Sequence, residues 1–344
     1  MMKKNKKIIR IILLVVLLSV GGTALHYYNT LFKSNVTNTE DEYLYIPTNS
    51  TFEDVMNIVK SENIIADTET FAWVAKRMKY KNIKPGKYKI SKGMSNVELV
   101  RMLRAGKQDP IKLQFQNIRL KKDFAGYIGS QLEVDSTQFL SMLDSMDLLR
   151  TLGFDEENIF CMFIPNTYEF YWNTSAEKFI TKMHDEYGKF WNDERIAKAK
   201  KIGLSPIEVS VLASIVDQEA LVNSELKRVA GVYMNRLNRD MKLEADPTVI
   251  YAIGDFGIKR VLNRMLQYNS PYNTYMYKGL PPGPICMPSV AAIDAVLSYE
   301  KHNYIYFCAK EDFSGYHNFA STVAEHQANA RKFQQALTKR RIMK

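Results

Sequence analysis

The longest apolar run of the chain lies near the N-terminus, where residues 11–25 carry no charged side chain. Lysines and Arg10 crowd the residues just before it, and Tyr27 and Tyr28 follow it. We therefore predict a basic tail over residues 1–7 and a transmembrane anchor over residues 8–28. By the positive-inside rule the tail is cytoplasmic and the rest of the chain lies outside the cytoplasmic membrane, in a single-pass topology. A cleaved signal peptide is the alternative, because Gly22 and Ala24 suit a cleavage site and the run is short for a span.

A polar stalk over residues 29–42 is predicted to lead into a small module over residues 43–108. Within the module one pattern occurs twice, as a short run with strand character followed by a capped helix; a further helix begins at Asp67 between the two copies. The order is thus strand, helix, helix, strand, helix, which indicates an α+β module that binds rather than catalyses. The capping boxes that mark the two repeated helices are Thr51 with Asp54 and Ser95 with Glu98.

Residues 109–203 form an intermediate region that is mostly helical between residues 136 and 192. The segment FIPNTYEFYW, residues 163–172, interrupts it with aromatic side chains and a turn at Pro165. Such a segment can stack on sugar rings, or it can be a hinge that packs on its own side chains. The pattern favours the hinge.

The most strongly marked helix spans residues 205–220 and has one acidic residue on its apolar side. Ser205 caps its start, and helical spacing places Leu212, Ile215 and Val216 on the same side as Glu219. Burial penalises the charged form of a carboxyl group, so the pKa of Glu219 should rise and the group could act as a general acid. The alternative is that the helix ends here and Glu219 reaches water or pairs with Arg228 or Arg236. Asp217 projects from the opposite side of the helix.

Further helices are predicted over residues 225–239, after Asp246, over residues 289–299 and at the C-terminal end. We expect Asp246 to be the N-cap of its helix, with Pro247 at the first position. Residues 268–288 form a proline-stiffened loop rich in tyrosine and asparagine. Rings and amides of this kind suit carbohydrate, so we expect this loop to form a wall of a glycan cleft.

Composition narrows the partners but does not identify one. The 344 residues carry a formal net charge of +10, which favours an acidic partner or surface, and an extracytoplasmic domain makes nucleic acid an unsuitable one. The three cysteines and five histidines show no metal-ligand spacing. We therefore expect no metal and no cofactor.

Five motifs together resemble the YceG-like endolytic murein transglycosylases, the MltG family. They are LASIVDQEA, VYMNRL, LEADPTVIYAIG, SPYNTYMYKGLPPGPI and GYHNF, in this order after the N-terminal anchor. The resemblance implies an α+β fold with the anchor, a LysM-like module over residues 43–108 and a mainly helical catalytic domain over residues 204–344. It also implies an enzyme that cuts nascent peptidoglycan strands and so terminates glycan elongation, with peptidoglycan synthases as possible partners.

The family resemblance assigns residues as well as activity. Its catalytic glutamate falls in a segment usually written with two glutamates around a basic residue, which here reads Asp217-Gln218-Glu219, so Glu219 is the implied catalytic residue. One acid suffices for a lytic transglycosylase, because the C6 hydroxyl of N-acetylmuramic acid attacks its own anomeric carbon and leaves a 1,6-anhydro end. The implied substrate-binding residues are Asn235, Arg236, Asp246, Thr248, Tyr251, Tyr272, Asn273, Thr274 and His317.

Two other functions fit the sequence. The first is a wall hydrolase that uses Asp246 or Glu244 as a second carboxylate. The second is a non-enzymatic peptidoglycan-binding or scaffold protein, in which Glu219 is a structural group.

Overall fold

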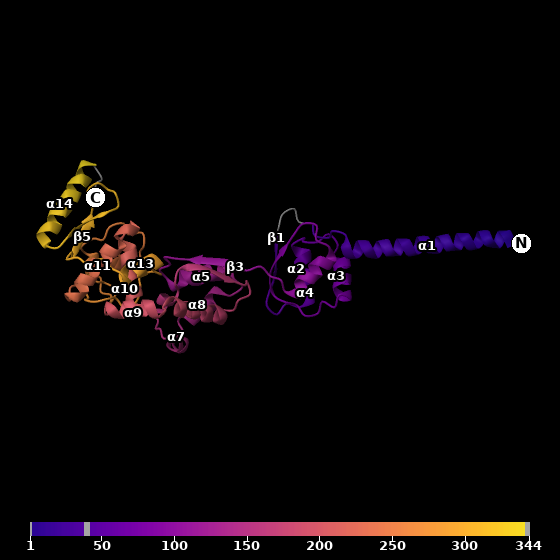
Figure 1. Ribbon diagram of the computed structural model, residues 1–344, viewed down its shortest axis with the longest axis horizontal. Helices are drawn as coiled ribbons and strands as arrows, with labels where there is room; N and C mark the ends of the chain where they lie inside the picture. Colours follow the sequence, from indigo (N-terminus) through magenta and orange to yellow (C-terminus); the bar gives the residue numbers. More distant parts are fainter. Residues whose placement is uncertain (1, 38–41, 341–344) are drawn as a thin grey trace. The chain divides into compact units, whose positions relative to one another are not determined.

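The computed structural model of the protein describes residues 2–37 and 42–340, and it is a mixed α+β structure with a long N-terminal helix (Figure 1). It divides into two compact units. The first runs from the N-terminus to Lys112 and includes Gln131–Glu133 and Glu169–Thr174. The remainder of the chain forms the second unit.

Helix α1 (Met2–Phe32) contains the apolar run. Its segment Lys6–Phe32 has a mean hydropathy of 2.5, and it is the one helix among the described residues that is long and apolar enough to cross a membrane. Its apolar side chains are exposed, as an anchor in lipid requires. A single-pass N-terminal anchor fits this helix, which extends beyond the predicted residues 8–28 at both ends.

The first unit contains the predicted strand–helix order. Strands β1 (Glu42–Ile46) and β2 (Gly86–Ile90) pair antiparallel, with Leu44 opposite Tyr88. Leu44, Tyr88 and Phe71 are completely buried in the core of the module. The helices are α2 (Phe52–Ser61), α3 (Thr68–Arg77) and α4 (Asn96–Ala105), and both predicted capping boxes, Thr51 with Asp54 and Ser95 with Glu98, are present.

The residues after the anchor differ from the free stalk expected over residues 29–42. Asn35 and Val36 are buried against the module, and the backbone N–H groups of both donate to the carbonyl oxygen of Met94. The Asn35 amide also donates to the side chain of Asn96 at 2.7 Å. Asn96 in turn donates to the carbonyl oxygen of Thr30 in α1. The anchor helix is therefore joined directly to the module; residues 38–41 of the expected stalk lie outside the described residues.

The part of the second unit between β3 (Ile111–Phe115) and α9 (Asp193–Lys201) is built on aromatic side chains. Phe115, Phe124 and Phe163 lie edge to face with ring centroids 4.7 to 6.5 Å apart. The aromatic segment of residues 163–172 contains strand β4 (Asn166–Phe170), which pairs with β3. Most of its rings are buried, and Phe163 and Tyr168 pack against Phe115 rather than against rings of their own segment. The helical elements here are α5 (Lys121–Gln131), α6 (Ser136–Leu143), α7 (Met146–Leu152), η1 (Ile159–Met162) and α8 (Ala176–Phe190).

Helix α10 (Pro206–Glu219) packs against both α11 (Leu226–Asn238) and α13 (Val290–Leu297), which also contact each other, in the core of the rest of the second unit (Figure 1). Every residue from 209 to 216 is buried, so the helix is enclosed on all sides rather than along one stripe. Its N-terminus carries the predicted capping box of Ser205 and Glu208. Around it lie η2 (Asn223–Glu225), α12 (Asp246–Ile253), η3 (Met265–Gln267), the antiparallel pair β5 (Tyr306–Ala309) and β6 (His317–Ala320), and α14 (Val323–Lys339).

Candidate active site

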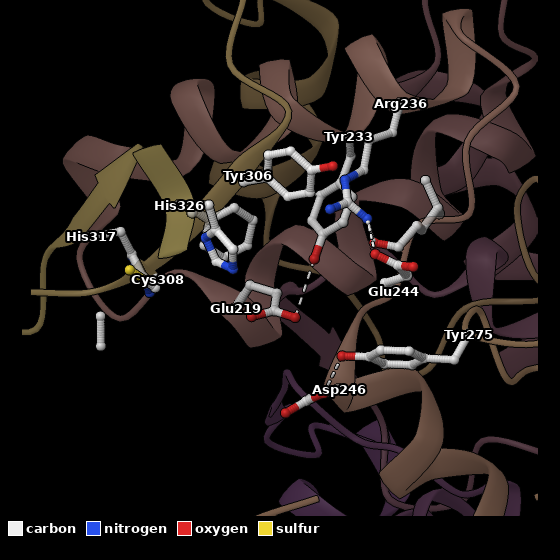
Figure 2. Close-up of a pocket in the computed structure, with 13 residues that line it drawn as sticks. Glu219, Tyr233, Arg236, Glu244, Asp246, Tyr275, Tyr306, Cys308, His317 and His326 are labelled. Carbon is white, nitrogen blue, oxygen red and sulfur yellow. Dashed lines mark hydrogen bonds and ion pairs between the residues drawn. The ribbon is translucent and has the colours of Figure 1, made fainter. Parts of the chain in front are cut away.

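A pocket of about 510 Å³ opens at the C-terminal end of α10 (Figure 2). Its volume lies within the range of about 300 to 1,000 Å³ that is usual for small-molecule sites. Side chains reach it from α10, α11, the start of α12 and strand β5. The polar ones are Glu219, Tyr233, Arg236, Glu244, Asp246, Tyr275, Tyr306, Cys308, His317 and His326.

Glu219 is the last residue of α10 and faces this pocket. Its side chain is packed among protein atoms but keeps some contact with solvent where it lines the pocket. Its Oε1 accepts a hydrogen bond of 3.1 Å from the hydroxyl of the buried Tyr233. Burial and, to a smaller extent, the negative charge of Asp246 raise the pKa of Glu219, while the Tyr233 hydrogen bond and Arg236 lower it, and the net pKa is about 7. The carboxyl group can therefore hold and release a proton near neutral pH.

Glu219 forms no ion pair with either arginine that the sequence offered as a partner. Arg228 pairs with Glu300 at 3.0 Å, and Arg236 pairs with Glu244 at 2.9 Å. Arg236 is almost completely buried and also donates to three backbone carbonyl groups, so its guanidinium group holds the backbone segments of this wall of the pocket together.

Asp246 lies in the pocket, but it is not the N-cap that we expected. Ala245 occupies the cap position without a side-chain hydrogen bond, and Asp246 is the first residue of α12. The carboxylate instead accepts a hydrogen bond of 2.7 Å from the hydroxyl of Tyr275 (Figure 2). An aspartate before a proline fits either position, and the nearby tyrosine hydroxyl accounts for this choice.

His317 lies at the start of β6 and lines the pocket opposite α12. Its Nδ1 lies 2.8 Å from a carboxylate oxygen of the buried Glu225, and its backbone N–H donates to the same carboxylate. This contact ties the β5–β6 hairpin to the segment that follows α10.

The other six residues that the family resemblance suggested do not line this pocket. Asn235 donates to the carbonyl oxygens of His302 and Tyr304. Asn273 is completely buried and donates to the carbonyl groups of Leu266 and Tyr268. The hydroxyls of Thr248 and Thr274 bond to each other at 2.8 Å. Tyr251 and Tyr272 border a separate hollow.

These buried groups act on the pocket indirectly. The Thr274 hydroxyl accepts from the backbone N–H of Ala245, and so the loop of residues 268–288 is fixed to the start of α12. That contact holds Tyr275 beside Asp246. The loop does supply a wall of the pocket, but through Tyr275 rather than through Tyr272, Asn273 or Thr274.

Asp217 has a structural contact on the far side of α10. Its carboxylate accepts hydrogen bonds from the backbone N–H and the hydroxyl of Ser289 at 3.1 and 2.6 Å. Ser289 is the N-cap of α13, so Asp217 fixes α13 against α10.

Several pocket residues were not singled out as functional by sequence, among them Tyr233, Tyr275 and His326. Tyr233 has the spacing of a core residue, and it is indeed buried, so only its hydroxyl distinguishes it. Tyr275 was one of several tyrosines in its loop. His326 stacks on Tyr306 with ring centroids 5.2 Å apart, and its buried Nδ1 has no hydrogen-bond partner among the described residues.

Over residues 2–37 and 42–340 no group of three or more histidine, cysteine, aspartate or glutamate side chains could hold a metal ion. The three cysteines are free thiols, and burial raises the pKa of each, that of Cys286 to about 12.

Comparison with known proteins identifies relatives across most of the chain. Residues 44–332 match the model of the YceG-like family. An endolytic murein transglycosylase of Bacillus subtilis (strain 168) is 27% identical over 332 residues, which cover 92% of this chain and 91% of that protein. One from Streptococcus pneumoniae serotype 2 (strain D39) is 26% identical, and the match covers 94% of this chain and 64% of that protein. The crystal structure of a YceG-like protein from Listeria monocytogenes superposes with a TM-score of 0.58 at 28% identity, covering 85% of this chain and 99% of that one.

Proposed function

The chain belongs to the YceG-like family, and from this premise we propose that it is an endolytic murein transglycosylase, as its relatives from Bacillus subtilis and Streptococcus pneumoniae are named. Its substrate is the glycan strand of peptidoglycan, which it cuts between N-acetylmuramic acid and N-acetylglucosamine. The observation that carries the proposal is Glu219, a carboxyl group in an open pocket with a pKa of about 7.

Glu219 performs both proton transfers of the reaction. As an acid it gives its proton to the glycosidic oxygen, and the bond from that oxygen to C1 of the muramic acid breaks. As a base it then takes the proton of the C6 hydroxyl, whose oxygen forms a new bond to C1. Glu219 thus regains the proton that it gave, no water is consumed, and the product is a 1,6-anhydro end. A pKa near the working pH suits a group that must alternate between the two roles.

The neighbours of Glu219 support these roles. The hydrogen bond from Tyr233 holds the carboxyl group in one orientation and stabilises its charged form. Asp246 lies in the same pocket, with Tyr275 fixing its direction, and its negative charge can stabilise the positive charge that develops at C1. Arg236, with its hydrogen bonds committed to Glu244 and to backbone, keeps this wall rigid.

Asp246 also keeps the hydrolase alternative open, because a second carboxylate in the pocket could activate a water molecule. Glu244 suits that role less, since it is paired with Arg236. The two mechanisms leave different ends: a transglycosylase leaves a 1,6-anhydro end, and a hydrolase leaves a reducing end that is heavier by one water molecule.

The test uses the detergent-solubilised full-length protein and purified peptidoglycan strands, with the new ends identified by mass. We expect anhydro ends, and we expect them to disappear in Glu219→Gln. Glu208→Gln is the matched control, because it changes a glutamate at the exposed start of the same helix, where it serves in a capping box. Reducing ends would support the hydrolase, and intact strands would support a binding or scaffold protein.

Membership of the family also suggests roles for the other parts of the chain. We propose that the module around β1, β2 and α2 to α4 is LysM-like and binds the glycan, and that residues 204–344 form the catalytic domain. Helix α1 would anchor the protein with its basic N-terminus in the cytoplasm and its catalytic domain outside. Cutting of new strands near the membrane would then terminate their elongation, beside the synthases that make them.

A further inference from the structure

Two smaller hollows lie next to the pocket of Glu219 in the second unit, and both include Arg119. One has a volume of about 150 Å³ and the other about 230 Å³. Tyr251 also borders both, so the two hollows are parts of one groove. Glu156, Glu157 and Lys121 line the larger hollow, whereas Arg119 is the one charged residue among those that line the smaller, so an anion fits the smaller hollow. Gln218 and Pro247 line the groove, whereas the residues next to them in sequence, Glu219 and Asp246, line the pocket. The groove and the pocket thus lie on different sides of the C-terminal end of α10 and the N-terminal end of α12.

The segment that carries Arg119 is fixed to the core of this unit. The backbone N–H of Asn117 donates to the carbonyl oxygen of Met287, and the N–H of Met287 donates to that of Ile118. The guanidinium group donates from Nη2 to Oε1 of Gln218, and it lies over the ring of Phe256 with 4.7 Å between Cζ and the ring centroid. A long side chain is therefore held in one position at the groove.

Arg119 is an unpaired cation in this position. Its side chain is partly exposed to the groove, and no carboxylate of the described residues forms an ion pair with it. A guanidinium group is always charged at neutral pH, and it presents N–H donors in a fixed fork that matches a carboxylate. The hydrogen bond to Gln218 uses one of these donors, and the others remain for a ligand.

We propose that Arg119 binds a carboxylate of the peptide stem on the muramic acid next to the cleaved bond, so that the enzyme selects strands that carry stems. This inference builds on the proposed function, which brings a glycan strand to Glu219. The sugar rings of such a strand are uncharged, and its anionic groups lie in the stems. The rings of Tyr251 and Phe256 pack against the apolar part of the stem, while Arg119 pairs with its acid group.

The experiment compares Arg119→Gln with wild type on three kinds of strand: strands with intact stems, strands whose stem carboxylates have been converted to amides, and strands stripped of stems. Wild type should cut intact strands faster than amidated ones. Arg119→Gln should lower kcat/KM on intact strands by roughly 10- to 100-fold, mainly through KM, because a charged hydrogen-bonded contact is lost. On amidated strands the variant and wild type should be equal. Arg119→Lys should restore part of the preference because it keeps the charge without the fork.

Arg228→Gln is the matched control, because Arg228 also lies over a ring, that of Phe319 at 5.5 Å, but already has Glu300 as its partner. It should leave the preference unchanged. Equal losses on all strands in Arg119→Gln would show that Arg119 acts only through Gln218 and would overturn the proposal. So would a wild type that cuts amidated strands as fast as intact ones. A preference that follows the lactyl carboxylate exposed on stripped strands would overturn the assignment to the stem.

A second measurement separates this proposal from the proposed function. Binding of a soluble muramyl peptide and of its amidated form is followed by NMR on the Glu219→Gln protein, with and without Arg119→Gln. We expect the free-acid form to bind more tightly, and only when Arg119 is present. Absence of this difference would refute the carboxylate site even if the enzyme is active. Absence of anhydro ends from every strand, with this difference intact, would refute only the proposed reaction.

Discussion

Glu219 keeps its proton near neutral pH because two unfavourable influences on its charge outweigh two favourable ones. Desolvation and Asp246 raise its pKa, and the Tyr233 hydroxyl and Arg236 lower it, with a result of about 7. The balance can be moved in either direction by changing a single neighbour, so the pocket offers direct tests of its own electrostatics.

The first test shifts the pH dependence of the reaction in opposite directions. Tyr233→Phe removes a hydrogen bond that favours the carboxylate, so the pKa of Glu219 should rise. Asp246→Asn removes a negative charge, so the pKa should fall. Because Glu219 must be protonated to act as an acid, kcat/KM decreases above its pKa. That decrease should move to higher pH in Tyr233→Phe and to lower pH in Asp246→Asn.

The measurement is kcat/KM for release of anhydro ends against pH in both variants and wild type. The midpoint of the decrease is compared, and not the maximum rate, because Asp246 also lies in the pocket. Midpoints that shift in the same direction would contradict the assignment of the acid to Glu219.

The second test uses stability. The folded pKa of Glu219 is raised above its ordinary value of 4.5, so the folded state binds the proton more tightly than the unfolded state. The wild-type protein should therefore lose stability as the pH rises from below 4.5 through about 7, by about 3 kcal/mol in all. Glu219→Gln has no such proton to lose. It should match wild type in acid and be more stable at alkaline pH.

Thermal melting of both proteins across this pH range checks the prediction, with Glu208→Gln as the control. The advantage of Glu219→Gln must grow with pH while that of Glu208→Gln does not. An advantage that is constant with pH would mean that the substitution acts through packing rather than through the charge.

Sequence pattern separated Glu219 from Asp217 but did not place the other candidates. Helical spacing was sufficient for Glu219, because a helix has a fixed angle per residue. Asn235 and Thr248 lie in helices α11 and α12, and Asn273 and Thr274 lie in a loop. At each of these positions an amide or hydroxyl group can face a ligand or satisfy a backbone group. In this fold they satisfy backbone groups and each other. The path of the backbone decides whether such a group binds a ligand or satisfies a backbone group, and this path cannot be inferred from the sequence pattern.

At the level of elements, the signals that depend on neighbouring residues were the reliable ones. The predicted caps at Thr51, Ser95 and Ser205 are all present, because each capping box needs only four consecutive residues. The strand in residues 166–170 was not predicted, since its pairing with β3 depends on residues far away in the chain. The cap at Asp246 failed for a similar reason, as Tyr275 comes from another loop.

The loop of residues 268–288 gives a prediction at this scale. The family resemblance placed Asn273 among the substrate-binding residues, a role in which Asn273→Ala would weaken turnover with little loss of stability. The structure reverses this expectation, because the buried amide of Asn273 serves the carbonyl groups of Leu266 and Tyr268. Asn273→Ala leaves them unsatisfied and should lower the free energy of unfolding by about 2 kcal/mol.

Denaturant unfolding of Asn273→Ala measures this loss. Asn269→Ala is the control, since Asn269 lies in the same loop but is exposed, and its side chain accepts a hydrogen bond from the Tyr277 hydroxyl. It should change the free energy of unfolding by less than about 0.5 kcal/mol. Equal effects at the two positions would show that the buried amide contributes nothing of its own.

At the scale of the whole molecule, composition and one apolar run predicted the anchor, but not how it is attached. The polar character of residues 29–42 suggested a free stalk. Polarity did not reveal that Asn35 has polar partners inside the first unit, or that Val36 is buried there. Burial of a short segment is hard to predict from sequence, because a single apolar residue such as Val36 gives no periodic pattern.

This attachment predicts where a soluble fragment should begin. A fragment that starts at Lys33 keeps Asn35 and Val36, and one that starts at Glu42 loses both. The shorter fragment should be less stable by about 2 to 4 kcal/mol, because it loses the burial of Val36 and leaves the side-chain oxygen of Asn96 without its donor. Melting of the first unit in the two fragments measures the difference. Identical melting temperatures would show that residues 33–37 do not stabilise the module.

The direct join between α1 and the first module also transmits the orientation of the helix. In a bilayer the tilt of a transmembrane helix depends on how its apolar length matches the thickness of the hydrocarbon layer. The carbonyl oxygen of Thr30 in α1 accepts a hydrogen bond from Asn96, and Tyr27 packs on Trp73 with ring centroids 5.5 Å apart. The module therefore cannot rotate freely relative to α1. A change in bilayer thickness would therefore lean the module toward the membrane or away from it, and the lipid would set the angle at which this unit stands on the surface.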